Sequence, residues 1–132
     1  MSDFRKLEVW QRAHELMLQV HEVTREIRGT QYLSLKNQIL RAAMSIPANI
    51  VEGRAQRSDR EFSRFVGYAI ASSSELEYHL FAATEIGVLS RGRTDPLVER
   101  TIGVRRMLIG LRKTLLAAAT PSSSATDSQS SP

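Results

Sequence analysis

A proline in the middle of a helical apolar pattern constrains the fold of this chain more than any other feature. Between Gln38 and Gly53, apolar residues recur at spacings of three and four, as on one helix face: Ile39, Ala42, Ala43, Ile46 and Ile50. Pro47 lies inside this pattern, where it has no backbone N–H and its ring collides with an earlier carbonyl, at a cost of about 3 kcal/mol. Burial of large apolar side chains, at about 1.5–3 kcal/mol each, can offset that cost. The stretch therefore predicts a buried helix that bends at Pro47.

The residues around the proline predict a shape element rather than a ligand pocket, because no catalytic group converges on them in the sequence. The neighbouring residues Ser45, Ala48 and Asn49 are expected to satisfy the carbonyls that the proline frees at Ala43 and Met44. We assign the predicted kink to Pro47, Asn49 and Gly53.

Two other stretches carry the seven-residue apolar repeat that is typical of helical bundles. The first stretch, predicted as a helix over residues 4–28, repeats Val9, Ala13, Leu16, Val20, Val23 and Ile27. The last stretch repeats Leu97, Thr101, Val104, Leu108, Leu111 and Leu115.

Short polar signals separate the helices from one another. Gly53 stands where a left-handed cap would end the second helix, which begins near residue 33. Ser58 opens an S-x-x-E capping box, so the third helix should start just after it and end near Gly87. Asp95 and Pro96 have the order of an N-cap and a first helical residue.

These patterns predict an all-α fold, an antiparallel up-and-down four-helix bundle with a proline-kinked second helix. The chain has 132 residues, which is enough for one hydrophobic core. We place the bundle at residues 1–117 and a disordered serine-rich tail at 118–132.

Several classes of protein are disfavoured by what the sequence lacks. It has no cysteine, no apolar leader and no apolar run near the ~20 residues of a membrane span. The Glu-x-x-His pairs of di-metal bundles, a nucleophile elbow and a phosphate-binding glycine loop are also missing. We expect a cytoplasmic protein that is not an enzyme and has no metal, no cofactor and no membrane partner.

Basic residues are the main candidates for a function. Arginine supplies 15 of the 18 basic residues, and the formal net charge is +4. Planar guanidinium groups bind phosphate well, although composition alone favours arginines that are solvated or paired with acids. The candidate nucleic-acid-binding residues are Arg54, Arg57, Arg60, Arg64, Arg91, Arg93, Arg105 and Arg106. No aromatic residues alternate with them, so we expect binding by charge and shape, largely without sequence specificity.

The first and last helices carry more apolar residues than one buried face requires. Such a surplus indicates a subunit interface or is ordinary exposed surface. The candidate interface residues are Trp10, Met17, Ile102 and Ile109.

Three stretches resemble a known bacterial family: FRKLEVWQRAHEL at 4–16, QILRAAMSIPANIVEG at 38–53 and SDREFSRFVGYAIASSSELEYHL at 58–80. These are the four-helix-bundle proteins encoded in intervening sequences of the large-subunit ribosomal RNA gene. They are related to the accessory variability determinant of diversity-generating retroelements. The residues that match the family signatures are Trp10, Gln11, Ile46, Pro47, Asn49, Glu52, Gly53, Glu61, Phe62, Arg64, Glu75, Leu76 and Glu77.

The resemblance implies a homopentameric, barrel-like ring of antiparallel four-helix bundles. For the retroelement accessory protein it also implies a basic surface that contacts nucleic acid and a reverse transcriptase. Two hypotheses stay open at this point. The chain is a homo-oligomer that binds RNA or DNA through arginines, or it is a structural adaptor whose ring docks another protein.

Overall fold

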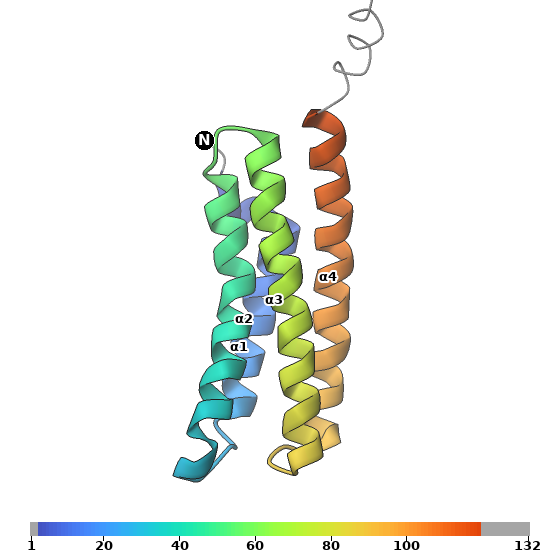
Figure 1. Cartoon of the computed structure of the whole chain (residues 1–132). Coiled ribbons are helices and arrows are strands. Elements are labelled where there is room, and N and C mark those ends of the chain that lie inside the picture. The colour runs from blue at the N-terminus through green and yellow to red at the C-terminus, as the bar shows by residue number, and fades with distance from the viewer. Residues whose placement is uncertain (1–2, 120–132) are drawn as a thin grey trace, which may run out of the picture.

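The computed structural model describes residues 3–119, and all the regular secondary structure in that range is helical. Its long helices are α1 (Glu8–Thr24), α2 (Leu33–Arg54), α3 (Asp59–Ile86) and α4 (Arg91–Ala119), and two short 3-10 helices, η1 (Phe4–Lys6) and η2 (Thr30–Tyr32), precede α1 and α2. Each long helix runs antiparallel to the one before it (Figure 1). Residues 3–119 contain no strand, so the predicted all-α, up-and-down four-helix bundle is confirmed.

The hydrophobic core follows the predicted seven-residue repeats. All six repeat residues of the first stretch are buried, and Ile27 stays buried although α1 ends at Thr24 rather than at residue 28. In α4 the repeat is buried except at Leu111, which is half-buried and packs against the core. Burial of these stripes is the main force that holds helices of this length together, because isolated helices are marginal in water.

The two ends of α3 confirm the sequence signals that predicted them. The Ser58 hydroxyl accepts the amide of Glu61 at 3.1 Å, as a capping box requires. Gly87 ends the helix with a φ of 91°, in the left-handed region that favours glycine, and its amide donates to the carbonyls of Ala83 and Thr84.

The predicted start of the last helix at Asp95 is wrong. The carbonyl of Ser90 accepts the amides of Arg93 and Thr94, so α4 already begins at Arg91 and Pro96 lies inside it. The carbonyl that Pro96 leaves without a helical partner is that of Gly92. Gly92 is exposed, so water can reach this group and the proline is tolerated.

The predicted left-handed cap at Gly53 is also wrong. The helix α2 continues to Arg54, and Gly53 does not have a positive φ. A Cβ added to Gly53 would lie 2.7 Å from Cδ1 of Phe62 and 2.8 Å from Cβ of Phe65. Glycine is therefore needed at this position because α3 passes too close for any side chain.

Pro47 is buried in the middle of α2, as predicted. The Asn49 side chain donates to the carbonyl of Ser45 at 2.8 Å and to its hydroxyl at 3.0 Å, not to Ala43 or Met44 as the sequence predicted. The Ser45 hydroxyl also lies 2.8 Å from the hydroxyl of Ser72 on α3. Ser45 thus ties α2 to α3 and is itself held by Asn49, and the bend at Pro47 stays a prediction.

Replacement of Gly53 by alanine tests this close contact. Alanine favours a helix over glycine by about 1 kcal/mol, yet we expect Gly53→Ala to lower the free energy of unfolding by about 1–3 kcal/mol through overpacking against Phe62 and Phe65. Urea denaturation followed by circular dichroism measures the change.

Gly110→Ala is the matched control, because a Cβ at Gly110 in α4 would meet nothing within 4 Å. It should raise the free energy of unfolding by about 0.5–1 kcal/mol. Equal stabilisation by both substitutions would contradict the close contact at Gly53.

Candidate nucleic-acid interface

The eight candidate arginines do not form one surface. Arg54, Arg57, Arg60 and Arg64 lie around the turn between α2 and α3, at one end of the bundle. Arg91 and Arg93 begin α4 at the opposite end, and Arg105 and Arg106 lie along its middle (Figure 1). We call the end that holds the α2–α3 turn the basic end.

Two of the four candidate arginines away from the basic end, Arg93 and Arg105, are paired with acids. Arg93 donates through Nε to Oε2 of Glu26 at 2.8 Å, and this bond raises its pKa. Arg105 donates to Glu77 at 2.5 Å and is only 20% exposed. Arg91 and Arg106 are exposed and have no such pair among the described residues. A paired arginine has less charge to offer a phosphate, so these positions contribute less than the sequence predicted.

The basic end, in contrast, holds unpaired cations. Arg57 and Arg60 are exposed and have no hydrogen-bond or ion-pair partner among residues 3–119. The Nε of Arg54 is buried and also lacks a partner there. A hollow of about 330 Å³ joins the side chains of Arg54 and Arg57 with the first turn of α3.

Arg112 belongs to the basic end although it is not among the eight candidate arginines. Its Nε lies 3.4 Å from the place that a Cβ of Gly67 would occupy, so its side chain lies against α3. The antiparallel order of α3 and α4 brings the last turns of one helix beside the first turns of the other. That consequence of the topology is the signal that would have found it.

Arg64 differs from the other arginines of the basic end because it is held by its neighbours. It donates to Oε1 of Glu61 at 2.7 Å and 3.1 Å and to the hydroxyl of Tyr68 at 2.8 Å. The bond to Glu61, and after it the bond to Tyr68, raise the pKa of Arg64. Its guanidinium also lies 5.0 Å from the ring centre of Phe65.

The predicted interface residues divide between core and surface. Trp10 and Met17 are half-buried against the core, and Trp10 also stacks on His14 with ring centres 4.8 Å apart. Ile102 is half-buried, and Ile109 is 41% exposed. Sequence reasoning missed larger exposed side chains, because their positions continue no repeat: Leu18, Leu33, Met44, Tyr68, Tyr78, Phe81 and Ile86.

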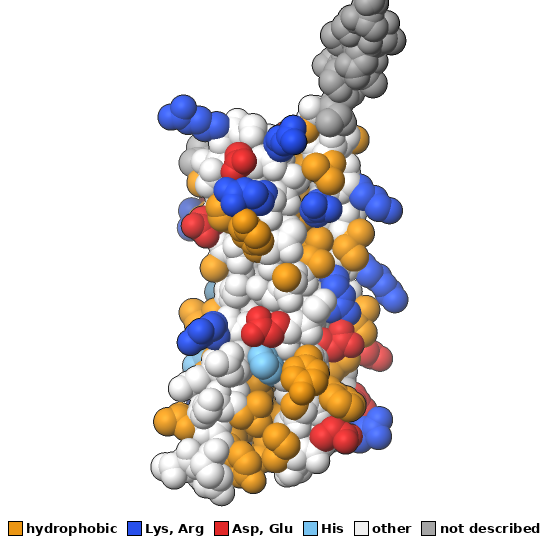
Figure 2. All heavy atoms as spheres, viewed as in Figure 1, with side chains coloured by type: hydrophobic (Ala, Val, Ile, Leu, Met, Phe, Trp, Pro, Cys, Tyr) orange, Lys and Arg blue, Asp and Glu red, His pale blue; other side chains and the backbone are white. Residues whose placement is uncertain are grey.

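Most Lys and Arg side chains on the face shown in Figure 2 lie in the part nearer the α2–α3 turn, whereas hydrophobic side chains are exposed along the whole face. Away from the basic end, α3 exposes Tyr78, Phe81 and Ile86. We call these three side chains the apolar end.

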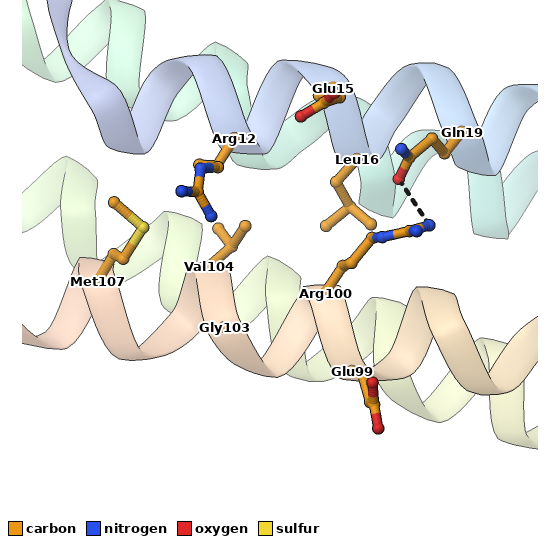
Figure 3. A pocket seen from close by; sticks show the side chains of 9 residues that line it. All are labelled: Arg12, Glu15, Leu16, Gln19, Glu99, Arg100, Gly103, Val104 and Met107. Carbon is orange, nitrogen blue, oxygen red and sulfur yellow. Dashed lines mark hydrogen bonds between the residues drawn. The ribbon is translucent and has the colours of Figure 1, made fainter.

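A hollow of about 470 Å³ lies between α1 and α4 (Figure 3). Leu16 and Val104 form its apolar floor, and Arg12 and Arg100 reach into it from facing helices. Arg100 donates to the side chain of Gln19 at 3.1 Å. The lining residues include no Ser, Thr, Cys or His, so the hollow has no nucleophile paired with a base.

The histidines do not gather into a metal centre. His79 lies 3.4 Å from a carboxylate oxygen of Glu75 one turn earlier. Within residues 3–119, no group of three or more His, Asp or Glu side chains is placed to hold a metal ion. No helix in the same range is long and apolar enough to cross a membrane.

The fold and its signature residues agree with one protein family. The family model of the 23S rRNA-intervening sequence protein matches residues 5–110, which include α1, α2, α3 and most of α4. The chain belongs to the 23S rRNA-intervening sequence protein family.

A solved structure supports the same fold for this member of the 23S rRNA-intervening sequence protein family. A crystal structure of a protein of unknown function, from the S23 ribosomal protein family of Bacteroides thetaiotaomicron VPI-5482, matches with a TM-score of 0.74 and 23% sequence identity. The match covers 80% of this chain and 98% of the other. No curated protein sequence matches the chain.

The family match ends short of the serine-rich segment. The structure extends α4 to Ala119, so residues 118 and 119 of the predicted tail are helical. The rest of that prediction, residues 120–132, lies outside the described residues.

Proposed function

We propose that this chain is a non-enzymatic, homo-oligomeric protein that binds nucleic acid through the basic end of its bundle, largely without sequence specificity. The observation that carries the proposal is the group of unpaired cations around the α2–α3 turn: Arg54, Arg57, Arg60 and Arg112. These arginines lie on three helices (α2, α3 and α4) and on the connector between α2 and α3. They therefore cover an area rather than a stripe along one helix.

Phosphate is the ligand that this arrangement suits best. Guanidinium groups bind phosphate oxygens bidentately, and each phosphate contact releases condensed counterions from the nucleic acid. Arg54 and Arg57 both line the hollow at the turn, so a phosphate that enters it would meet two guanidinium groups. Several copies of the basic end in one oligomer would multiply these contacts and make binding steeply dependent on salt.

Removal of the free charges tests the proposal. We expect the double variant Arg57→Ala and Arg60→Ala to bind a labelled RNA about tenfold more weakly than wild type. The slope of log affinity against log salt should fall by about 1 per arginine removed. Fluorescence anisotropy between low and moderate salt measures both quantities.

The opposite end supplies a control that removes the same charge. Arg28 and Arg91 are also exposed and without a partner among the described residues. Their double alanine variant should bind RNA like wild type, because these residues lie at the far end of the bundle. If the two double variants lose affinity equally, binding follows net charge and the assignment to the basic end is wrong.

The homo-oligomer is proposed from the resemblance to ring-forming relatives and from the exposed apolar side chains of α2, α3 and α4. We take a pentamer as the ring size, and the bend at Pro47 as the feature that sets the angle between subunits. In wild type, light scattering should give about five times the 14.8 kDa subunit mass.

Pro47→Ala should keep helix content and shift the mixture of oligomers, whereas Pro96→Ala, at an exposed proline also inside a helix, should leave it unchanged. A 14.8 kDa species at micromolar concentration would contradict the oligomer itself. An unchanged ring in Pro47→Ala would reduce that proline to a local packing feature.

A second candidate function is a structural adaptor that docks another protein, such as the reverse transcriptase of a retroelement. The apolar end formed by Tyr78, Phe81 and Ile86 favours it, since such side chains are enriched in protein interfaces. Recovery from native lysate of one discrete protein that survives nuclease treatment, and its loss with Phe81→Ser, would favour the adaptor. Recovery that nuclease abolishes would favour nucleic-acid binding.

A further inference from the structure

We infer that the basic end takes single-stranded nucleic acid and that the exposed ring of Tyr68 is the surface on which a base stacks. This inference rests on the proposed function and specifies the class of its ligand. It also replaces the expectation of binding by charge and shape alone, which assumed that no aromatic side chain stands among the arginines.

The ring of Tyr68 is both exposed and held in place. Tyr68 is 45% exposed on α3, and its hydroxyl accepts a hydrogen bond from Nη1 of Arg64 at 2.8 Å. The edge of its ring meets Phe65 with ring centres 5.5 Å apart and planes at 84°. Arg64 lies 5.6 Å from the centre of the Tyr68 ring and is itself fixed by Glu61.

This fixed position matters for stacking because a mobile side chain loses conformational freedom when a base orders it. Arg64 and Phe65 hold Tyr68 before any ligand arrives. Arg64 thus acts as a positioning residue, since the acceptor oxygen of Glu61 already occupies its guanidinium.

Free cations flank the ring on two sides. Arg60 lies eight residues before Tyr68 on α3, about 12 Å along the helix axis. Arg112 of α4 lies against α3 at Gly67, the residue before Tyr68 in the sequence. A strand that passes from Arg60 to Arg112 would place phosphates on the cations and a base over the ring.

The chemistry of this surface favours unpaired bases over a duplex. Bases in a duplex stack on one another and expose only their edges, whereas an unpaired base offers its face to an aromatic ring. Tyr68 stands on the convex outer surface of α3, without the depth of a protein pocket that would enclose the base. A flexible single strand can follow such a surface and bring its phosphates to cations on both sides.

Tyr78 on the same helix shows what the site requires. It is 63% exposed, more than Tyr68, yet its ring neighbour is His79 and the stretch from Ser72 to Ser90 has three acids and no Lys or Arg. Exposure alone is therefore not the basis of the inference. Tyr78 provides a control with the same side chain on a stretch of α3 that has no Lys or Arg of its own.

The test compares a labelled oligouridine with a blunt RNA duplex of the same number of phosphates, using the full chain and fluorescence anisotropy. Wild type should bind the single strand at least tenfold more tightly. Tyr68→Ala should lose about tenfold for the single strand with an unchanged salt slope, because stacking releases no counterions. Tyr68→Phe should keep most of the affinity, and Tyr78→Ala all of it.

A spectroscopic readout keeps the test independent of changes in stability. In Tyr68→Trp the new indole should be quenched when oligouridine stacks on it, whereas Tyr78→Trp should show no quenching. Trp10 is the only tryptophan of the natural chain and gives both variants the same background.

The outcomes separate this inference from the proposed function. Equal affinity for strand and duplex, or full affinity in Tyr68→Ala together with absent quenching in Tyr68→Trp, would overturn the stacking site. If Arg57→Ala with Arg60→Ala still weakens binding in that case, the basic end remains the binding surface. If the wild type binds neither RNA, both the stacking site and nucleic-acid binding by the basic end are overturned. The same conclusion follows if the wild type captures a discrete, nuclease-resistant protein and Tyr68→Ala abolishes that capture.

Discussion

The close contact between α2 and α3 is the constraint on which the rest of the structure depends. Gly53 has no side chain because Phe62 and Phe65 occupy the space that a Cβ would need. Near the middle of α2, Asn49, Ser45 and Ser72 form a hydrogen-bonded bridge between the helices. These contacts sit on either side of Pro47, so the helix that carries a costly residue is also the one most firmly attached to its neighbour.

This contact also determines where the cations lie. The tight approach at Gly53 leads directly into the turn that carries Arg54 and Arg57, and the start of α3 then presents Arg60 beside them. The return of α4 adds Arg112 to the same end, over the bare backbone at Gly67. The close approach of α2 and α3 thus accounts both for the small residue at Gly53 and for the position of the arginines at the basic end. In the proposed function, the signature residue Gly53 would act indirectly, by placing these arginines.

Much of the fold was predictable, and less of the site was. The apolar repeats, the Ser58 cap and the Gly87 end are local patterns, so the four helices and their order followed from the sequence. The role of Gly53 was not predictable, because glycine is selected both by a close approach of two helices and by a left-handed helix cap. The sequence alone does not distinguish these two roles. Charge counts along the chain also missed that Arg93 is paired with a residue 67 positions away and that Arg112 reaches α3. Ion pairs between residues far apart in the sequence help to decide which arginines are free, and local sequence patterns do not predict such pairs.

The central claim is that nucleic acid binds at the basic end of the bundle. Ultraviolet cross-linking of the full chain to oligouridine, followed by peptide mapping, tests it most directly because it reports contact without altering any residue. The account predicts cross-links in the segment from Arg54 to Tyr68, and none around the α3–α4 turn where Arg91 and Arg93 lie. Cross-links concentrated at the α3–α4 turn, or spread evenly over both ends of the bundle, would contradict it.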